Sequence, residues 1–591
     1  MHFVEKDIML FYNLIHHSIM IYIHSFVLGF FISLSYKPKI KWTLLIIVIF
    51  SALFSFLYLL INEVTGQGFT RSFWFHLQEN FKGGTYYPYL VFFIIKLIFY
   101  LSIFFLGFFI KIKFFNFIKT INNYSITIIF LCILIFNPSL ISLAKSYQDW
   151  KTDSIINLDL KFNNVFKNNE RLSDNFKKRD IILISLESFE RSFYSQDSFS
   201  ELNLSLFKRN DFIDFSNIEE VEGFTDWTIA GLVASNCGVP IIDQENLNSV
   251  AGSNSFYPNL NCFSDLLSKQ GYNVLSIQGT DSEFAGTGNF YSVHSANEIY
   301  DLKEIYDYFP DRHSKISHWG FHDDTVFDFA LDKVKFLENL KSPYSIWLNT
   351  VDTHAPNGLL SEDCKEITRN ISSPFLKTIY CTDLYLNNFI ENIKLYDEDK
   401  NNLIVIHSDH LLMNSPVSRQ YFKDSKKRKN LFVIIDPYEI KNYTEIKSPG
   451  NHLDIPATIS DYLGGVDRQG LGVSLLKIKN EYFSLSSNQF NIVQILKSFQ
   501  NDLENLSDKI ILLEGTIIPE KEVLELNSGF QIKIPVISTY GKIFNTNTDA
   551  RGLPREDLGH LLYKLIEKNY SPLKLEAVTK WDQIKEIFNN I

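Results

Sequence analysis

The chain has 591 residues and a mass of 68.7 kDa, which is too long for one ordinary domain and predicts two or three. Hydrophobic residues make up 46% of it and charged residues 21%, proportions that exclude a disordered chain. The 56 lysines and arginines are outnumbered by 67 aspartates and glutamates. The resulting net charge of −11 argues against a nucleic-acid-binding protein, which would carry a basic face. The 5 cysteines are too few for a disulfide scaffold or for repeated zinc modules.

Four apolar runs lie before residue 146, and they predict a bundle of four transmembrane helices. The last three runs are each about 20 residues long, the length that crosses about 30 Å of hydrocarbon. The first run is weaker because it carries histidines, and an interfacial helix or a signal peptide is the alternative for it. The runs cover approximately Ile8–Tyr36, Trp42–Ile61, Tyr89–Ile110 and Tyr124–Ala144.

Lysines in the connecting loops predict the orientation of these helices. Loops 37–41 and 111–123 are rich in lysine, whereas loop 62–88 has only one arginine and one lysine. Because positively charged loops remain in the cytoplasm, the chain after residue 145 is expected to lie outside it. The expected organisation is transmembrane helices in 1–145, a linker in 146–178, an extracytoplasmic domain in 179–475 and a small α+β region in 476–591.

The cysteines agree with this topology, because Cys132 lies in the fourth apolar run and the other four lie in the extracytoplasmic part. An even number fits two disulfides in an oxidising compartment. Pairing of sequence neighbours, Cys237 with Cys262 and Cys364 with Cys381, is the simplest arrangement. Four cysteines allow three connectivities, and buried free thiols are the alternative.

The extracytoplasmic part alternates short apolar runs with helical patterns. Near-continuous apolar strands between helices predict a mostly parallel α/β sheet that is covered on both faces. In such sheets ligands bind beyond the carboxyl ends of the strands. Residues 476–591 predict short strands followed by two amphipathic helices. The strands are expected at 181–186, 273–278, 344–351, 402–407 and 430–436, and helices at 325–340 and 382–396.

Acidic residues and histidines follow three of these strands. Glu187 follows the first strand, Asp352 and His354 follow the third, and Asp409 and His410 follow the fourth. Each alone fits a turn or a helix cap. Together, at one edge of a sheet, they predict a site for a divalent cation such as Zn²⁺ or Mn²⁺.

The segment 221–240 supplies a candidate nucleophile. A glycine turn leads to Thr225, and the residues after it have the pattern of a helix. A hydroxyl at a helix N-terminus lies beside free N–H groups that can hold a phosphate, and metal coordination would activate it. The alternative role for Thr225 is an N-cap, and Thr228 is a rival nucleophile on the same turn.

Six segments resemble, in order, the lipoteichoic acid synthase and phosphoglycerol transferase branch of the alkaline phosphatase/sulfatase superfamily. The resemblance covers roughly residues 40–475 and implies a sulfatase-like α/β catalytic domain. The segments are LESFERSFYSQD, GFTDWTIAGLVASNCGVP, SIQGTDSEFAGTGNF, SHWGFHDDTVFDFA, LNTVDTHAPNG and VIHSDHLLMN.

The resemblance implies roles for individual residues. One divalent metal, Mn²⁺ or Zn²⁺ with Mg²⁺ as a further candidate, is expected on Glu187, Thr225, Asp409 and His410, and Thr225 is expected to attack a phosphodiester. The substrate-binding residues are expected to be His354, Trp319, Gln278 and His452. His452 could instead hold a second metal or donate a proton, or be an ordinary loop residue.

The resemblance also implies a function. The expected reaction moves phosphoglycerol from phosphatidylglycerol to a periplasmic glycan through a covalent threonine intermediate. The enzyme is expected to be a multi-pass protein of the bacterial inner membrane, in contact with membrane lipid, whose catalytic domain faces the periplasm. The alternatives are a phosphoethanolamine transferase acting on lipid A or glycan, and a membrane-anchored binding protein without activity.

Two departures narrow this expectation. Ala285 and Thr287 stand where the synthases carry Trp and Arg, which disfavours a polyglycerol-phosphate polymerase. No C/S-x-P-x-R motif follows Thr225, which disfavours sulfate ester hydrolysis.

Overall fold

The computed structural model describes most of residues 162–477. The gaps in this range are 196–198, 200, 242–255, 258–259, 356, 398, 414–415 and 423–427. Also described are single residues within 54–61 and 94–106, Ser139, and short stretches at 489–499, 502–503, 515–518, 523–526 and 531–533.

The four predicted transmembrane helices lie almost wholly outside the described residues, and so do the two amphipathic helices predicted at the C-terminus. Within the described part of the chain, no helix combines the length and the apolar character needed to cross a bilayer. Contacts divide the chain into two units, and the fold and site below belong to the unit made of residues 75–84, 154–412 and 424–591.

An eight-stranded mixed sheet forms the centre of this unit, in the order β5-β4-β6-β1-β7-β8-β2-β9. The first five strands in that order run parallel, and β8 alone runs against its neighbours. The predicted mostly parallel sheet is therefore confirmed. The strands are β5 (Glu298–Tyr300), β4 (Asn273–Gln278), β6 (Tyr344–Asn349), β1 (Asp180–Leu186), β7 (Asn402–Ser408), β8 (Phe432–Ile435), β2 (Phe212–Phe215) and β9 (Thr444–Ile446).

Strand β1 occupies the middle of the sheet, and five of its seven residues are apolar. All seven are buried, as are all residues of β6 and β7 on either side. Ser185 of β1 pairs with Asn349 of β6 and His407 of β7. This register brings the residues that follow the three strands to one edge.

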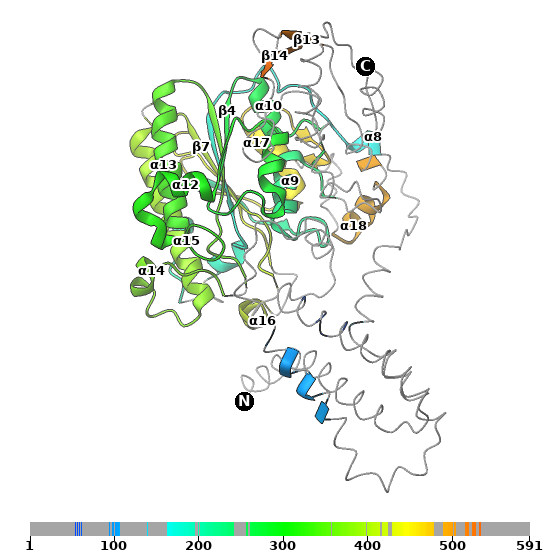
Figure 1. The fold of residues 1–591 in the computed structure, drawn as a ribbon. Coiled ribbons are helices and arrows are strands. Elements are labelled where there is room, and N and C mark those ends of the chain that lie inside the picture. Colours follow the sequence, from blue (N-terminus) through cyan, green and yellow to red (C-terminus); the bar gives the residue numbers. More distant parts are fainter. Residues whose placement is uncertain are drawn as a thin grey trace, which may run out of the picture. The chain divides into compact units, whose positions relative to one another are not determined.

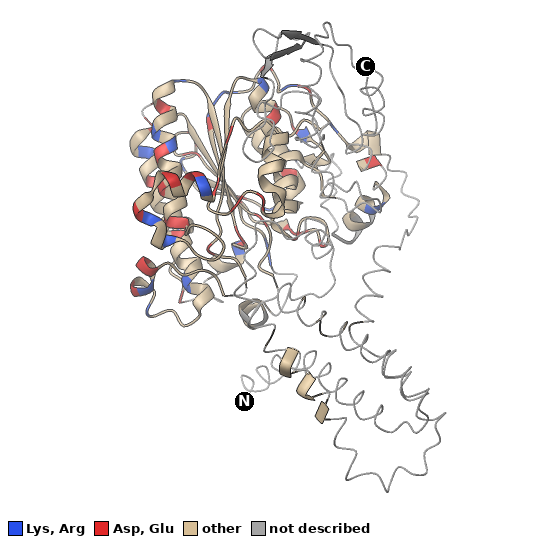
Figure 2. Cartoon of the chain, in the orientation of Figure 1, with Lys and Arg blue, Asp and Glu red and all other residues tan. Residues whose placement is uncertain are grey.

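Helices cover both faces of the sheet (Figure 1). α13 (Asp323–Leu340) and α15 (Pro374–Tyr396) pack together on one face, and α9 (Thr228–Cys237), α10 (Phe263–Lys269) and α17 (Ile455–Tyr462) lie on the other. Charges of both signs are interspersed on α13 and α15, whereas α9 has no charged residue (Figure 2). α9 is therefore a buried element whose N-terminus can approach the strand ends.

The remaining elements are short. The predicted strands in 476–591 are represented by an antiparallel sheet of β13 (Gly515–Ile518), β14 (Val523–Leu526) and β15 (Gln531–Lys533). Two-stranded pairs join β3 (Ile218–Glu219) to β10 (Gly450–Asn451) and β11 (Arg468–Gln469) to β12 (Gly472–Val473). The other helices are α8 (Phe162–Val165), α11 (Thr287–Val293), α12 (Leu302–Tyr308), α14 (Glu362–Ile367) and α18 (Gln489–Ser498), and α16 (Pro416–Tyr421) belongs to the other unit.

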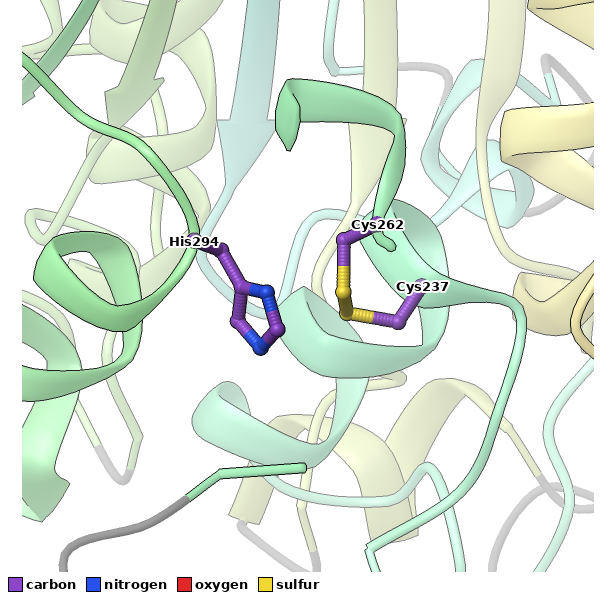
Figure 3. Close-up of side chains that lie close together, drawn as sticks. All are labelled: Cys237, Cys262 and His294. Atoms are coloured by element: carbon purple, nitrogen blue, oxygen red, sulfur yellow. A yellow bond between two sulfur atoms is a disulfide. The ribbon is translucent and has the colours of Figure 1, made fainter. Parts of the chain in front are cut away.

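The four cysteines of this unit form the two disulfides expected between sequence neighbours, Cys237–Cys262 and Cys364–Cys381. The first joins the end of α9 to the start of α10, and His294 lies beside it (Figure 3). A Cys–Cys–His group can bind a metal, but here the sulfurs are bonded to each other. His294 Nδ1 is 2.8 Å from Asp265 Oδ2, and its Nε2 is 2.6 Å from the Phe256 carbonyl oxygen. The group is therefore structural.

Candidate active site

Three predicted metal ligands meet at the strand-end edge. Glu187 follows β1, and Asp409 and His410 follow β7. One ligand atom from each lies within 4.8 Å of the other two, and all three side chains are buried. His410 Nε2 lies 3.5 Å from Glu187 Oε1 and 3.4 Å from Asp409 Oδ2.

Hydrogen bonds fix one polar atom of Asp409 and one of His410, and the other polar atom of each side chain points toward the ligand set. Asp409 Oδ1 accepts the N–H groups of Ser188, at 2.8 Å, and of His410, at 2.6 Å. His410 Nδ1 is 2.8 Å from the Leu411 carbonyl oxygen. Among the residues that the structure describes, Asp409 Oδ2 and His410 Nε2 are buried and have no hydrogen-bond partner. Buried donors and acceptors without a hydrogen-bond partner are rare in folded proteins. Carboxylate and imidazole ligands whose second polar atom is fixed by a hydrogen bond are typical of a divalent-cation site.

The charges of the bare site also point to a cation. Burial raises the pKa of Glu187, but the neighbouring His410 and His354 lower it to well below its ordinary value. Burial and the charge of Glu187 raise the pKa of Asp409 well above its ordinary value. Burial lowers the pKa of His410, and the two carboxylates raise it well above its ordinary value. Two buried carboxylates therefore compete for one positive partner, a conflict that a bound cation removes.

The first residue of α9, Thr228, lies against these ligands. Its hydroxyl donates a hydrogen bond to Glu187 Oε2 at 3.2 Å, and its side chain is only partly buried. Thr225, by contrast, is completely buried, and its hydroxyl oxygen accepts the Val221 N–H at 3.0 Å inside the preceding turn. The structure therefore places the rival threonine, Thr228, at the ligand set. The sequence predicted that the helix begins at Thr225, but α9 begins three residues later, at Thr228.

Gly231 explains how α9 approaches the ligands so closely. A Cβ atom at this position would overlap the carbonyl oxygen of Asp409. Gly231 lies three residues after Thr228, on the same face of the helix. Only a residue without a side chain allows this face to touch the β7 end.

Two predicted substrate residues, His354 and Trp319, come together from separate segments. Their rings are 4.5 Å apart, and both are partly exposed. The loop that carries His354 is fastened to Glu187, since Thr350 Oγ1 accepts the Glu187 N–H at 3.0 Å and the Thr353 hydroxyl donates to the Glu187 carbonyl oxygen. Both rings are thus placed where a bound substrate could reach them.

The two other predicted substrate residues lie differently. Gln278 is buried at the end of β4, and its amide donates to Thr287 Oγ1 at 3.0 Å. His452 is completely buried, with Nε2 2.9 Å from the Ser408 carbonyl oxygen, and burial lowers its pKa to about 3. Both side chains are therefore enclosed by protein and bonded to it, and their role in substrate binding stays a prediction.

Two acidic residues beside the site had no recognisable sequence signal. Glu220 Oε2 accepts the Leu411 N–H at 2.7 Å. Burial and the neighbouring Asp226 raise the pKa of Glu220 to about 8, and burial raises that of Asp226 to about 6. Both lie on the chain segment that leads into α9, so only the fold shows that they lie near His410.

Comparison with known proteins gives two family matches. Residues 17–152 match the family model described as phosphoglycerol transferase I, N-terminal domain, and residues 228–466 match the sulfatase family model. Over 365 residues the chain is 31% identical to phosphoglycerol transferase I of Escherichia coli O139:H28, a match that covers 61% of this chain and 46% of that protein. The chain is therefore similar to phosphoglycerol transferase I over part of its length.

The chain spans about half the length of the curated relatives that it matches. Similar solved structures include the lipoteichoic acid synthase LtaP of Listeria monocytogenes, with 15% identity, 58% of this chain and 98% of that chain covered, and a TM-score of 0.42. Another is the lipooligosaccharide phosphoethanolamine transferase EptA of Neisseria meningitidis, with 13% identity, 76% and 96% covered, and a TM-score of 0.39.

Proposed function

We propose that this protein transfers phosphoglycerol from phosphatidylglycerol to a periplasmic glycan, with Thr228 as the nucleophile. One observation carries the proposal. The Thr228 hydroxyl, at the start of α9, donates a hydrogen bond to Glu187. Beside it lie Asp409 Oδ2 and His410 Nε2, two buried atoms that have no hydrogen-bond partner among the described residues. A hydroxyl at a metal-ligand set and at a helix N-terminus is the arrangement of a metal-dependent phosphotransferase.

The residues have distinct tasks in this reaction. Glu187, Asp409 and His410, with Thr228, would hold one divalent cation, Mn²⁺ or Zn²⁺. When bound, the cation would lower the pKa of the hydroxyl and offset the phosphate charge. The Thr228 oxygen attacks phosphorus, the diacylglycerol oxygen leaves, and the free N–H groups of the first turn of α9 hold phosphate oxygens. An acceptor hydroxyl then displaces the threonine.

The choice of phosphoglycerol rests on the match to phosphoglycerol transferase I in the N-terminal segment and along the sulfatase-type domain. The proposed setting is the bacterial inner membrane, with the four apolar runs as anchors and the sulfatase-type domain on the periplasmic side. Anchoring raises the effective concentration of the site at the lipid headgroup. His354 and Trp319 are the proposed contacts for the substrate.

The test uses the full chain in vesicles of phosphatidylglycerol with Mn²⁺, followed by mass measurement of the intact protein and its peptides. A phosphoglycerol adduct on Thr228 is the expected result. An adduct formed only from vesicles of phosphatidylethanolamine would identify a phosphoethanolamine transferase. No adduct from either lipid, together with no bound metal, would leave a binding protein without activity.

Metal binding gives a separate prediction. Addition of Mn²⁺ at about 100 times its dissociation constant should raise the melting temperature by roughly 5 °C, because binding stabilises the folded state by about 2.7 kcal/mol. Asp409→Asn should abolish the shift, because it removes a ligand charge. Asp328→Asn, at an exposed carboxylate on α13, is the matched control and should keep it. Retention of the full shift by Asp409→Asn would contradict the assigned ligands.

A further inference from the structure

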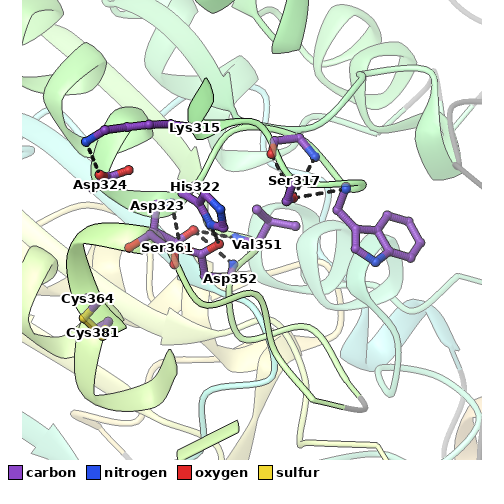
Figure 4. A network of polar contacts seen from close by, with 12 residues as sticks. Lys315, Ser317, His322, Asp323, Asp324, Val351, Asp352, Ser361, Cys364 and Cys381 are labelled. Atoms are coloured by element: carbon purple, nitrogen blue, oxygen red, sulfur yellow. Dashed lines mark hydrogen bonds and ion pairs between the residues drawn. A yellow bond between two sulfur atoms is a disulfide. The ribbon is translucent and has the colours of Figure 1, made fainter. Parts of the chain in front are cut away.

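A buried carboxylate and a partly exposed histidine form a pair beside the proposed site (Figure 4). His322 directly precedes α13, and its Nδ1 lies 2.7 Å from Oδ1 of Asp352, in the loop after β6. The side chain of Asp352 is 3% exposed and that of His322 is 13% exposed. Twenty-nine residues of helix and strand lie between them, so only the fold brings them together.

Asp352 is held in a fixed orientation. Its Oδ2 accepts the Asp323 N–H at 3.0 Å. Asp323 in turn accepts the N–H groups of Val351, at 2.8 Å, and of Asp352, at 3.2 Å, and the Thr382 hydroxyl at 2.8 Å. Burial and the charge of Asp352 raise the pKa of Asp323 to about 8, and burial raises the pKa of Asp352 against the lowering effect of His322.

The orientation of the imidazole follows from that of Asp352. A carboxylate accepts hydrogen bonds, so Nδ1 of His322 carries a proton and donates it to Asp352. Among the described residues, Nε2 of His322 has no hydrogen-bond partner, and the ring is accessible to solvent. A carboxylate that fixes one imidazole nitrogen while the other stays free is the geometry of a histidine that transfers protons.

The pair lies on the same edge of the sheet as Thr228. The loop that carries Asp352 is bonded to Glu187 on both sides, through Thr350 and Thr353. The ring of His354, two residues after Asp352, contacts Trp319, three residues before His322. His322 therefore lies on the same edge of the sheet as His354 and Trp319, the proposed contacts for the substrate.

We propose that His322 and Asp352 form the proton-transfer pair of this phosphotransferase, with His322 as the acid and base and Asp352 as its positioning residue. The inference rests on the proposed function. In the first half-reaction the Thr228 oxygen, which has already lost its proton to solvent, forms a bond to phosphorus. The bond from phosphorus to the diacylglycerol oxygen breaks, and that oxygen takes the proton from Nε2.

The second half-reaction returns the proton. The acceptor hydroxyl oxygen forms a bond to phosphorus, its proton passes to Nε2, and the bond from phosphorus to the Thr228 oxygen breaks. His322 is again protonated at both nitrogens, and the donor and acceptor have exchanged one phosphoglycerol group. A sugar hydroxyl and a diacylglycerol hydroxyl are both weak acids, so each half-reaction gains from the same group.

The test compares two donors in the full chain with Mn²⁺. One is phosphatidylglycerol in vesicles and the other is the nitrophenyl ester of phosphoglycerol, whose leaving group needs no proton. His322→Gln should slow adduct formation from the lipid by about 10²-fold or more and leave adduct formation from the nitrophenyl ester close to that of the wild type. When the nitrophenyl ester is the donor and a glucan oligosaccharide is the acceptor, the phosphoglycerol adduct should accumulate on His322→Gln, because the variant lacks the base for the second half-reaction. His313→Gln, at a histidine stacked on Tyr306, is the control and should match the wild type.

The pH profile gives a second readout. Burial lowers the pKa of His322, but its bond to Asp352 raises it above the ordinary value, with support from nearby Asp323 and Asp324. Asp363 and His318 also face this ring. Asp352→Asn removes the main cause of the raised pKa. His322 should therefore lose its proton at a lower pH in this variant. The pH at which the rate of the lipid reaction falls on the alkaline side should be lower than in the wild type.

The outcomes separate the two proposals. Suppose that the wild type forms an adduct. If His322→Gln then slows the reaction equally with both donors, or slows it with neither donor, the proton-transfer pair is wrong and the proposed phosphotransferase function stands. If the wild type forms no adduct from either donor, both proposals fail. A solvent isotope effect on the wild type with the lipid and not with the nitrophenyl ester is expected, and its absence counts against the pair even where a variant fails to fold.

Discussion

Replacement of Thr228 with alanine is expected to abolish the covalent phosphoglycerol adduct and to lower transfer by about 10⁴-fold or more, because the attacking oxygen is removed. The fold should survive, since this side chain is partly exposed and its hydroxyl forms a hydrogen bond to Glu187. Mass measurement of the full chain after incubation with phosphatidylglycerol vesicles checks the adduct, and thermal unfolding checks the fold.

Thr225→Ala is the matched control for this experiment. It removes the hydroxyl that accepts the Val221 N–H, which should cost about 1 kcal/mol of stability. Per folded molecule, adduct formation should remain close to that of the wild type. An adduct that disappears in Thr225→Ala and persists in Thr228→Ala would show that Thr225 is the nucleophile after all.

Replacement of Gly231 with alanine is expected to damage the site without touching any ligand. The added Cβ atom would overlap the Asp409 carbonyl oxygen, which is backbone and cannot rotate away. α9 must therefore move away from the β7 end and carry Thr228 with it. A displacement of about 1 Å costs roughly 10²-fold in rate, and overpacking costs about 1–3 kcal/mol of stability. Adduct rate and thermal unfolding measure the two effects.

The control for Gly231→Ala is Ala234→Gly in the same helix. Glycine lowers helix stability by about 1 kcal/mol but introduces no overlap, so the rate per folded molecule should be unchanged. This comparison separates loss of stability from displacement of Thr228. A wild-type rate in Gly231→Ala would mean that the position of α9 against Asp409 does not control the reaction.

The sequence alone predicted five strands of the central sheet and a candidate cation site at one edge of it. Short, near-continuous apolar runs between helical patterns indicate buried strands of a mostly parallel sheet, and residues after parallel strands gather at one edge. Glu187, Asp409 and His410 could be named for that reason. The disulfide pairs could be expected from sequence proximity. Strands β2, β5 and β9, of three or four residues each, were missed because so few residues show no periodicity.

The tertiary structure decided which of the nearby groups face the site. Thr225 and Thr228 differ by three positions, and only the start of α9 shows that the second one meets Glu187. Burial shows that His452 is enclosed, although its spacing resembles that of a site residue. His322 and Asp352 carry no shared motif and meet only through the fold. Periodicity reports which face of an element is buried, whereas the register between elements depends on packing that no local pattern encodes.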